Sequence, residues 1–138
     1  MIENRYGTLL GEYNQEITEL GSPLPVLWNV AGHEISRFKN DAHILEIGCG
    51  DGASIEPILR RTAVTADLLD VSADMIAKAA RRLGAHRFRL RFMTADAYEY
   101  LKVCDAYDAI FSSFTIHNFK QKDKDRVFGV ICERLRKG

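Results

Sequence analysis

The sequence predicts an α/β fold built around a mostly parallel sheet. After about residue 40, short apolar runs alternate with amphipathic stretches of about ten residues, which is typical of repeated strand-helix units. One apolar run ends in a glycine-rich loop followed by a helical pattern, as expected at the carboxyl end of a parallel strand. The 138 residues, 46% of them hydrophobic and 28% charged, provide for one core.

The expected elements follow one another in a regular order. Two amphipathic helices come first, over about residues 1–22 and 24–38, and Gly21-Ser22-Pro23 separates them. Strands are then expected at 43–47, 64–69, 87–93 and 107–111, with helices at about 53–61, 73–83, 97–102 and 122–136. Ser72 is expected to cap the N-terminus of the helix 73–83.

Charge and cysteine content restrict the class of protein. Nineteen basic residues balance nineteen acidic ones, so no overall field favours nucleic acid or an anionic membrane surface. A basic cluster at 81–91 is expected to scatter over solvated faces. The three cysteines form no zinc-ligand pattern, so reduced thiols, no metal and a cytoplasmic location are expected. No apolar run approaches the roughly 20 residues that span a bilayer.

A glycine-rich loop after the first expected strand is the strongest functional signal. The run is Leu45-Glu46-Ile47-Gly48-Cys49-Gly50-Asp51-Gly52. Alternate glycines allow a tight turn and leave no Cβ between the main chain and a ligand, while the following helix presents free N–H groups. Three interpretations fit this loop alone: a structural turn, a dinucleotide site with the pattern Gly48-x-Gly50-x-x-Ala53, and a site for a sulfonium ligand.

Glu46 helps to separate these interpretations. A carboxylate two residues before the first glycine would repel the pyrophosphate of a nicotinamide or flavin dinucleotide. A sulfonium ligand with an ammonium group supplies the cation that the carboxylate prefers, and it needs no phosphate cradle. Asp70, eighteen residues after Gly52, still suits the acidic residue of a dinucleotide fingerprint.

Residues 43–138 resemble the class I S-adenosylmethionine-dependent methyltransferases in five motifs that occur in the family's order. These are the glycine loop, Leu69-Asp70-Val71-Ser72-Ala73-Asp74-Met75, Thr94-Ala95-Asp96-Ala97, and the runs 107–118 and 130–138. The resemblance implies a Rossmann-like three-layer sandwich with strands 1–4 present and strands 5–7 missing from this chain. It also implies an amino-terminal helical lid over 1–40 and an S-adenosylmethionine-binding domain over 41–138, truncated before strand 5.

The resemblance assigns roles in binding S-adenosylmethionine. It implies that Asp70 accepts from the ribose hydroxyls, that Asp96 and Ala97 bind the adenine, and that carbonyls after the fourth strand hold the methionine ammonium. The implied donor-binding residues are Glu46, Gly48, Cys49, Gly50, Gly52, Asp70, Val71, Met75, Asp96, Ala97, Ser112 and Ser113. As alternatives, Asp70 and Asp96 could be helix caps, and Val71 and Met75, which would flank the adenine, could be core residues.

The chemistry needs few catalytic groups. Methyl transfer from a sulfonium is a direct displacement, so alignment of the reactants and exclusion of water matter most. A hydroxyl or protonated amine acceptor also needs a base, and His117 is the only histidine expected near the carboxyl ends of the strands. His117 is therefore the candidate catalytic residue, with a structural role in the loop as the alternative. From the lid, Tyr13 or Trp28 could contact the donor.

The acceptor stays unidentified, with a small molecule favoured over nucleic acid. Three other functions stay open: an NAD(P)-binding Rossmann protein, an enzyme like the carboxy-S-adenosylmethionine synthases, and a non-catalytic cofactor- or partner-binding module. The run Phe114-Thr115-Ile116 faintly resembles those synthases. Missing strands would leave the strand 107–111 as an open edge, which a second copy or a partner chain would cover.

Overall fold

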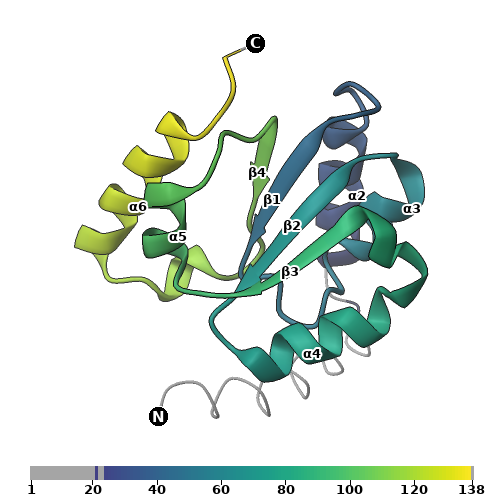
Figure 1. Cartoon of the computed structure of the whole chain (residues 1–138), viewed down its shortest axis with the longest axis horizontal. Helices are drawn as coiled ribbons and strands as arrows, with labels where there is room; N and C mark the ends of the chain where they lie inside the picture. The colour runs from purple at the N-terminus through teal and green to yellow at the C-terminus, as the bar shows by residue number, and fades with distance from the viewer. Residues whose placement is uncertain (1–20, 22–23, 138) are drawn as a thin grey trace.

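The computed structural model describes residue 21 and residues 24–137, so the helix predicted over 1–22 lies almost wholly outside the described residues. Within them, four parallel strands form one sheet with the order β3-β2-β1-β4 (Figure 1). The strands are β1 (His43–Ile47), β2 (Thr65–Asp70), β3 (Leu90–Thr94) and β4 (Ala109–Phe111). The predicted α/β fold with a parallel sheet is confirmed.

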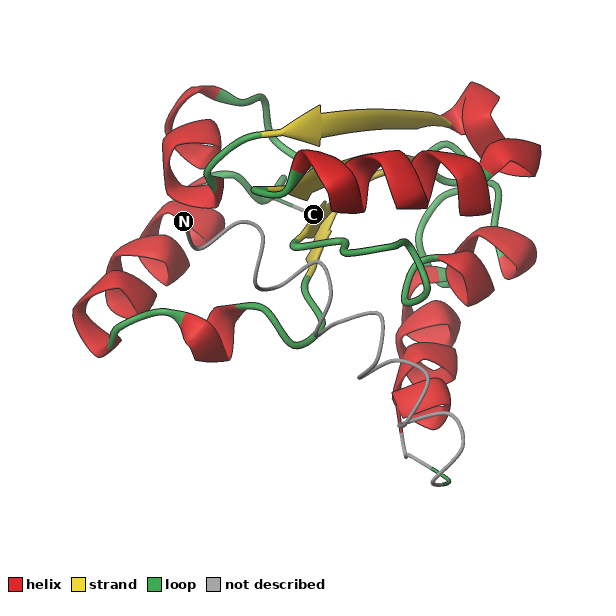
Figure 2. Cartoon of the chain, turned by 90° about the horizontal axis from the view of Figure 1, so that it is seen from below, coloured by secondary structure: helices red, strands yellow, loops and turns green. Residues whose placement is uncertain are grey.

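Helices cover both faces of this sheet (Figure 1, and Figure 2 from below). One face carries α2 (Leu24–Ile35), α3 (Glu56–Arg61) and α4 (Ala73–Arg82); the other carries α5 (Ala97–Val103) and α6 (Gln121–Glu133). Two short 3₁₀ helices, η1 (Gly84–Arg89) and η2 (Ile116–Asn118), precede β3 and α6. None of the helices in the described ranges combines the length and apolar character needed to cross a membrane.

The central strand β1 divides the core into two clusters. Ile44 packs on the side of α3 and α4, whereas Leu45 and Ile47 pack on the side of α5 and α6. All three side chains are fully buried, as expected for a parallel strand covered on both faces. Glu46 is the polar exception in this run, and it is also fully buried.

The strand predicted at 87–93 begins later, at Leu90. Residues 84–89 form η1 instead, and Phe88 is 82% exposed, although its alternation with charged residues suggested a strand. Arg89 explains the difference, because its guanidinium donates to the carbonyls of Leu59 (2.8 Å) and Thr62 (2.7 Å). These bonds hold the segment against the end of α3, so Arg89 does not lie on a solvated face as expected.

The fourth strand is also shorter than the predicted 107–111. Tyr107 forms a parallel bridge with Leu135 on the side of β4 that faces away from β1. Its N–H donates to the Arg134 carbonyl (2.8 Å), and its carbonyl accepts from Arg136 N–H (2.9 Å). The chain after α6 thus covers the beginning of the edge that was expected to stay open, and a partner chain on the remaining part stays a prediction.

Two predicted helix boundaries depend on side-chain caps. Ser72 caps α4 as predicted, since its hydroxyl accepts from Met75 N–H at 3.4 Å. Asp96 caps α5 in the same way, accepting from Glu99 N–H at 3.0 Å. Both caps follow a strand directly, so each positions the end of its strand as well as the helix.

Candidate functional site

The candidate site lies where the strand order reverses, between the carboxyl ends of β1 and β4. Ligands of open parallel sheets bind at such a reversal. The loop after β1 contacts the chain after β4 there: Ser112 Oγ donates to the Ile47 carbonyl (3.0 Å) and Thr115 Oγ1 to the Gly48 carbonyl (3.2 Å). The two predicted motifs, far apart in sequence, therefore form one site.

The glycine loop needs its glycines for two different reasons. Gly48 has φ of 70°, and a Cβ on it would lie 1.9 Å from Thr115 Oγ1, so the close approach of the strand exit requires glycine. Gly50 has φ of 54°, but a Cβ there would meet no atom of the described residues within 4 Å. The loop is thus closed at Gly48 and borders open space at Gly50, where a ligand could approach the main chain.

Glu46 is a buried carboxyl beneath this loop with one oxygen free. The Ser54 hydroxyl donates to Oε1, whereas Oε2 has no hydrogen-bond partner among the described residues. Burial raises the pKa of Glu46 to about 8; the Ser54 hydrogen bond opposes this shift, while Asp70 and Asp51 add to it. The Glu46 carboxyl therefore either binds a proton or, when it is ionised, favours a cation beside it.

Asp70 joins the end of β2 to the loop. One carboxylate oxygen accepts from Gly50 N–H and the other from Ser72 N–H, both at 2.9 Å. The capping role that was an alternative for Asp70 belongs to Ser72. Because a carboxylate has about four acceptor positions, Asp70 keeps the capacity to accept from further donors.

The remaining residues predicted for the adenine end differ in exposure. Asp96 is exposed and caps α5, and Ala97 begins that helix. Val71 is 52% exposed at the end of β2, whereas Met75 is only 2% exposed. Val71 is thus free to contact a ligand, while the burial of Met75 agrees with the alternative that it is a core residue. The contacts of all four with a donor stay predictions.

The cysteine of the loop is a core residue as well. Cys49 is 3% exposed, and burial raises the pKa of its thiol. Its N–H donates to the Leu69 carbonyl (3.0 Å), and its carbonyl accepts from Gly52 N–H (2.9 Å). The contribution of Cys49 to the site is therefore the shape of its main chain.

The chain after β4 forms a shallow cavity of about 230 Å³. Its lining residues are Ser112, Phe114, Thr115, Ile116 and His117. Phe114 has φ of 58°, which is strained for a bulky side chain and is typical of functional sites. The exposed His117 ring meets the Phe114 ring edge to face, with 5.8 Å between centroids. The candidate base therefore lies at the wall of an open cavity.

A long-range contact brings the predicted lid to this exit. The Trp28 indole N–H, on α2, donates to Ser113 Oγ at 2.9 Å. Of the two aromatic residues suggested for the lid, Trp28 thus reaches the strand exit, while Tyr13 lies outside the described residues. Ser54 was missed by the sequence analysis, since nothing local to it indicates a partner eight residues earlier in the chain.

The comparisons with known proteins agree with this geometry. Residues 44–138 match the family model described as "Methyltransferase domain". The chain therefore belongs to the methyltransferase domain family, as its motifs predicted. S-adenosylmethionine is the methyl donor that this family uses.

A curated relative and two solved structures illustrate the likeness. Malonyl-[acyl-carrier protein] O-methyltransferase 2 of Ilyobacter polytropus is 37% identical over 81 residues, which are 58% of this chain and 30% of the relative. CalS10, a S-adenosylmethionine-bound amino pentose methyltransferase from Micromonospora echinaspora, superposes with a TM-score of 0.75 at 21% identity, covering 91% of this chain and 52% of CalS10. A Geobacter sulfurreducens methyltransferase in complex with S-adenosyl-L-homocysteine has a TM-score of 0.68 at 19% identity, covering 83% and 45%. The chain thus spans about a third to a half of these proteins.

Proposed function

We propose that this chain is the donor-binding part of an S-adenosylmethionine-dependent methyltransferase that acts on a small molecule by direct displacement. The observation that carries the proposal is the free Oε2 of Glu46, a fully buried carboxyl oxygen beneath a glycine loop that borders open space at Gly50. An unpaired buried carboxylate is costly, so the site favours a ligand with a positive group. The donor, when bound, supplies an electrophilic methyl group on a sulfonium and also carries an ammonium group.

The residues present fit the other parts of this donor. Asp70 has acceptor positions left for the two ribose hydroxyls after its bonds to Gly50 and Ser72. Hydrogen bonds from hydroxyls to an ionised carboxylate are among the stronger ones. Asp96 and Ala97 would bind the adenine, and Val71 would cover one of its faces. Carbonyls of Ser112 and Ser113 would share the ammonium with Glu46.

A dinucleotide is disfavoured at the same place. The carboxylates of Asp70 and Asp51 lie close enough to Glu46 to raise its pKa. A pyrophosphate at this loop would leave the buried Glu46 protonated and its Oε2 without a cationic partner, whereas a cationic donor favours the charged form of Glu46. The surroundings of Glu46 therefore disfavour NAD(P) as the ligand of this loop.

Calorimetry with S-adenosylmethionine, S-adenosylhomocysteine and NAD tests the proposed donor. We expect heat with the first two and none with NAD. The variant Asp70→Asn should weaken donor binding by about tenfold, since a charge-assisted bond becomes a neutral one. Asp74→Asn is the matched control, because Asp74 is an exposed acid of the same motif, and it should change the affinity by less than about twofold. Heat with NAD alone would contradict the proposal.

His117 is proposed as the base for a hydroxyl or protonated amine acceptor. It lines the cavity after β4 and is accessible to a molecule that enters it. The relatives' names differ on the acceptor, a malonyl group in one and an amino pentose in the other. A malonyl carboxylate is already deprotonated and needs no base, so turnover of His117→Gln separates these acceptor classes. Turnover that falls while donor affinity stays constant supports the base, and unchanged turnover excludes it.

Methyl-labelled donor and mass spectrometry of a cell extract incubated with the protein would identify the acceptor. A labelled small molecule supports the proposal. Donor consumption with the label retained on a sulfonium product indicates chemistry like that of the carboxy-S-adenosylmethionine synthases. Donor binding with no labelled product indicates a binding module. A cytoplasmic location is part of the proposal, because the free cysteines Cys49, Cys104 and Cys132 suit a reducing compartment.

A further inference from the structure

Arg82, at the C-terminal end of α4, reaches the glycine loop from outside. Its Nη2 lies 2.8 Å from Asp51 Oδ2, and its Nε donates to the Asp51 main-chain carbonyl at 3.1 Å. Its Nη1 lies 3.4 Å from Glu56 Oε2, at the start of α3. The planar guanidinium thus connects α4, the loop and α3 through one side chain. Arg82 is exposed, as expected for the basic cluster, but its guanidinium is also bound to two acidic residues.

The loop is also held from the chain after β4, through Thr115, and from the side of β2. Its first N–H, that of Gly48, donates to the Leu69 carbonyl at 2.7 Å, and Gly50 N–H donates to Asp70 Oδ2 at 2.9 Å. Arg82 binds the next residue, Asp51. Two consecutive residues of the turn, Gly50 and Asp51, are therefore bound by β2 and by α4, respectively.

Asp51 transmits the contact with Arg82 to the main chain. Its Oδ1 accepts from Ala53 N–H at 3.1 Å, while its Oδ2 and its carbonyl oxygen face Arg82. The Asp51 side chain is 18% exposed and that of Arg82 is 40% exposed, so water screens the pair only in part. Burial opposes the charge of Arg82, but Asp51 and Glu56 outweigh it and raise its pKa. The Arg82 guanidinium is therefore positively charged at any physiological pH.

Leu83, which follows Arg82 at the end of α4, contacts the same loop through its apolar side chain. Gly52 has φ of 83°, and a Cβ there would lie 2.8 Å from Leu83 Cδ1. Leu83 is fully buried and forms the C-cap of α4. The end of α4 thus packs against Gly52 with one residue and binds Asp51 with the one before it.

We propose that Arg82 is a positioning residue of the donor site, which holds Asp51 and thereby the main chain of the glycine loop in the conformation that receives the donor. Arg82 acts through Asp51 and does not itself contact the donor. The inference rests on the proposed function for the identity of the donor. The effect of Arg82 on the loop, however, is measurable without any donor.

Amide hydrogen exchange of the donor-free protein tests the loop. In Arg82→Met, which keeps an unbranched apolar side chain and removes the charge and the donors, exchange at Gly50, Asp51 and Gly52 should rise by about tenfold. Exchange in β3, which Arg82 does not touch, should stay unchanged. Arg81→Met is the matched control, because Arg81 is the exposed neighbour on the same helix, and it should leave loop exchange within about twofold of the original protein.

Calorimetry then measures the consequence for S-adenosylhomocysteine binding. The dissociation constant should rise by about tenfold in Arg82→Met, by less in Arg82→Lys, and by under about twofold in Arg81→Met. If Arg82→Met does not fold, Arg82→Lys and a salt titration of the original protein replace it, since salt should weaken the Arg82 contacts. The proposal would be overturned if Arg82→Met changed neither the loop exchange nor the affinity. It would also be overturned if Arg82→Met and Arg81→Met changed them equally. Loop exchange that rises in a protein with no affinity for the ligand contradicts the proposed donor and leaves the role of Arg82 in the loop intact.

Discussion

Two buried carboxyl groups on neighbouring strands have opposite surroundings. Glu46 on β1 and Asp67 on β2 are 0% and 1% exposed. Glu46 lies on the face of the sheet covered by α3 and α4, and Asp67 lies on the face covered by α5 and α6. Glu46 accepts from Ser54 alone among the described residues and keeps one oxygen free. The two groups therefore differ in their partners and not in their burial.

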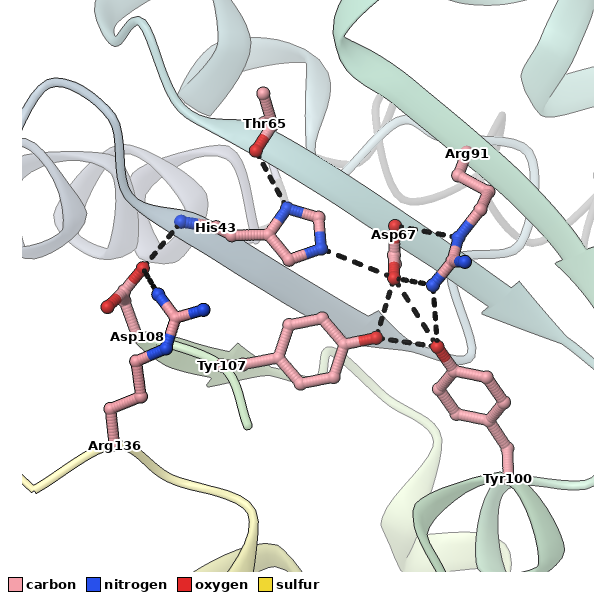
Figure 3. Close-up of polar contacts among 8 residues, drawn as sticks. All are labelled: His43, Thr65, Asp67, Arg91, Tyr100, Tyr107, Asp108 and Arg136. Carbon is pink, nitrogen blue, oxygen red and sulfur yellow. Dashed lines mark hydrogen bonds and ion pairs between the residues drawn. The ribbon is translucent and has the colours of Figure 1, made fainter. Parts of the chain in front are cut away.

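Asp67 has donors from four other residues (Figure 3). Tyr107 O–H donates to Oδ2 at 2.6 Å, the Arg91 guanidinium contacts both oxygens, and His43 Nε2 lies 3.3 Å from Oδ2. Tyr100 O–H completes the set at 3.3 Å. Burial acts to raise the pKa of Asp67, but the bonds from Arg91 and Tyr107 outweigh it and lower the pKa. This carboxylate connects β1, β2, β3 and α5.

The number of filled acceptor positions separates a structural carboxylate from one that has capacity left for a ligand. A buried charge whose acceptor positions are filled by the protein stabilises the fold and has little left for a ligand. A buried carboxyl with a free oxygen weakens the fold and keeps its binding capacity for something else. Asp67 is the first kind, and Glu46 is the second.

Removing the carboxylate of Asp67 should have the largest effect on stability. Asp67→Ala leaves two tyrosine hydroxyls, the Arg91 guanidinium and the His43 ring without their shared acceptor, so the free energy of unfolding should fall by about 3–5 kcal/mol. Urea denaturation measures the loss, with the isosteric Asp67→Asn as the milder variant. Donor affinity of the folded fraction should stay within about twofold. A variant that loses affinity but not stability would reverse the assignment.

Removing the charge of Glu46 should have the opposite pattern. In Glu46→Gln, which keeps the shape and the Ser54 contact, donor affinity should fall roughly thirtyfold, or about 2 kcal/mol, because the ammonium loses a charged acceptor. The free energy of unfolding near pH 8 should stay the same or rise. Calorimetry and urea denaturation on the same samples measure both. Loss of stability without loss of affinity would make Glu46 a structural residue.

The pH dependence of the free energy of unfolding tests the surroundings of Glu46 in a second way. The pKa of Glu46 is about 8 in the folded protein against an ordinary 4.5, so between these values the folded state holds more protons than the unfolded state. The free energy of unfolding should therefore fall as pH rises through this window, by up to about 1.4 kcal/mol per pH unit. Urea denaturation at several pH values should reveal this slope, and Glu46→Gln should remove it.

Donor binding at neutral pH gives a second measure of the same proton. A bound ammonium group favours the charged form of Glu46, so close to one proton should be released near pH 7. Calorimetry in phosphate and in Tris buffer counts this proton. Equal heats in the two buffers for the original protein would mean that Glu46 does not change its ionisation.

Loss of the hydrogen bond between Trp28 and Ser113 should have the smallest effect on donor affinity and on stability. Trp28→Phe removes the indole N–H and keeps an aromatic ring, and Ser113→Ala removes its partner. Each should weaken donor binding by about 1 kcal/mol or less and change stability little. In the double variant the two effects should not add, because both break one hydrogen bond. A fully additive result would show that the bond does not couple the lid to the strand exit.

Local patterns in the sequence predicted the elements and motifs well, and contacts between distant residues poorly. Ser72 and the glycine loop were predicted correctly because caps and tight turns depend on residues close in the chain. The segment 84–89 was predicted wrongly as part of a strand, because its alternation resembles one while Arg89 binds carbonyls about 30 positions earlier. Arg82 and Trp28 acquire their partners only when α4 and α2 pack beside the loop and the strand exit.

The parallel α/β order and the methyltransferase domain family follow from the amino-acid sequence, since they are visible in its periodicity and in short-range turn motifs. The surroundings of the two buried acids, in contrast, depend on tertiary packing. Glu46 and Asp67 look alike in sequence, because each is an acid with an apolar residue on either side within a strand. The number of donors around each acid depends on which face of the sheet its side chain enters and on the residues of distant elements that pack there. Periodicity places the acid on a face, but only packing supplies its partners.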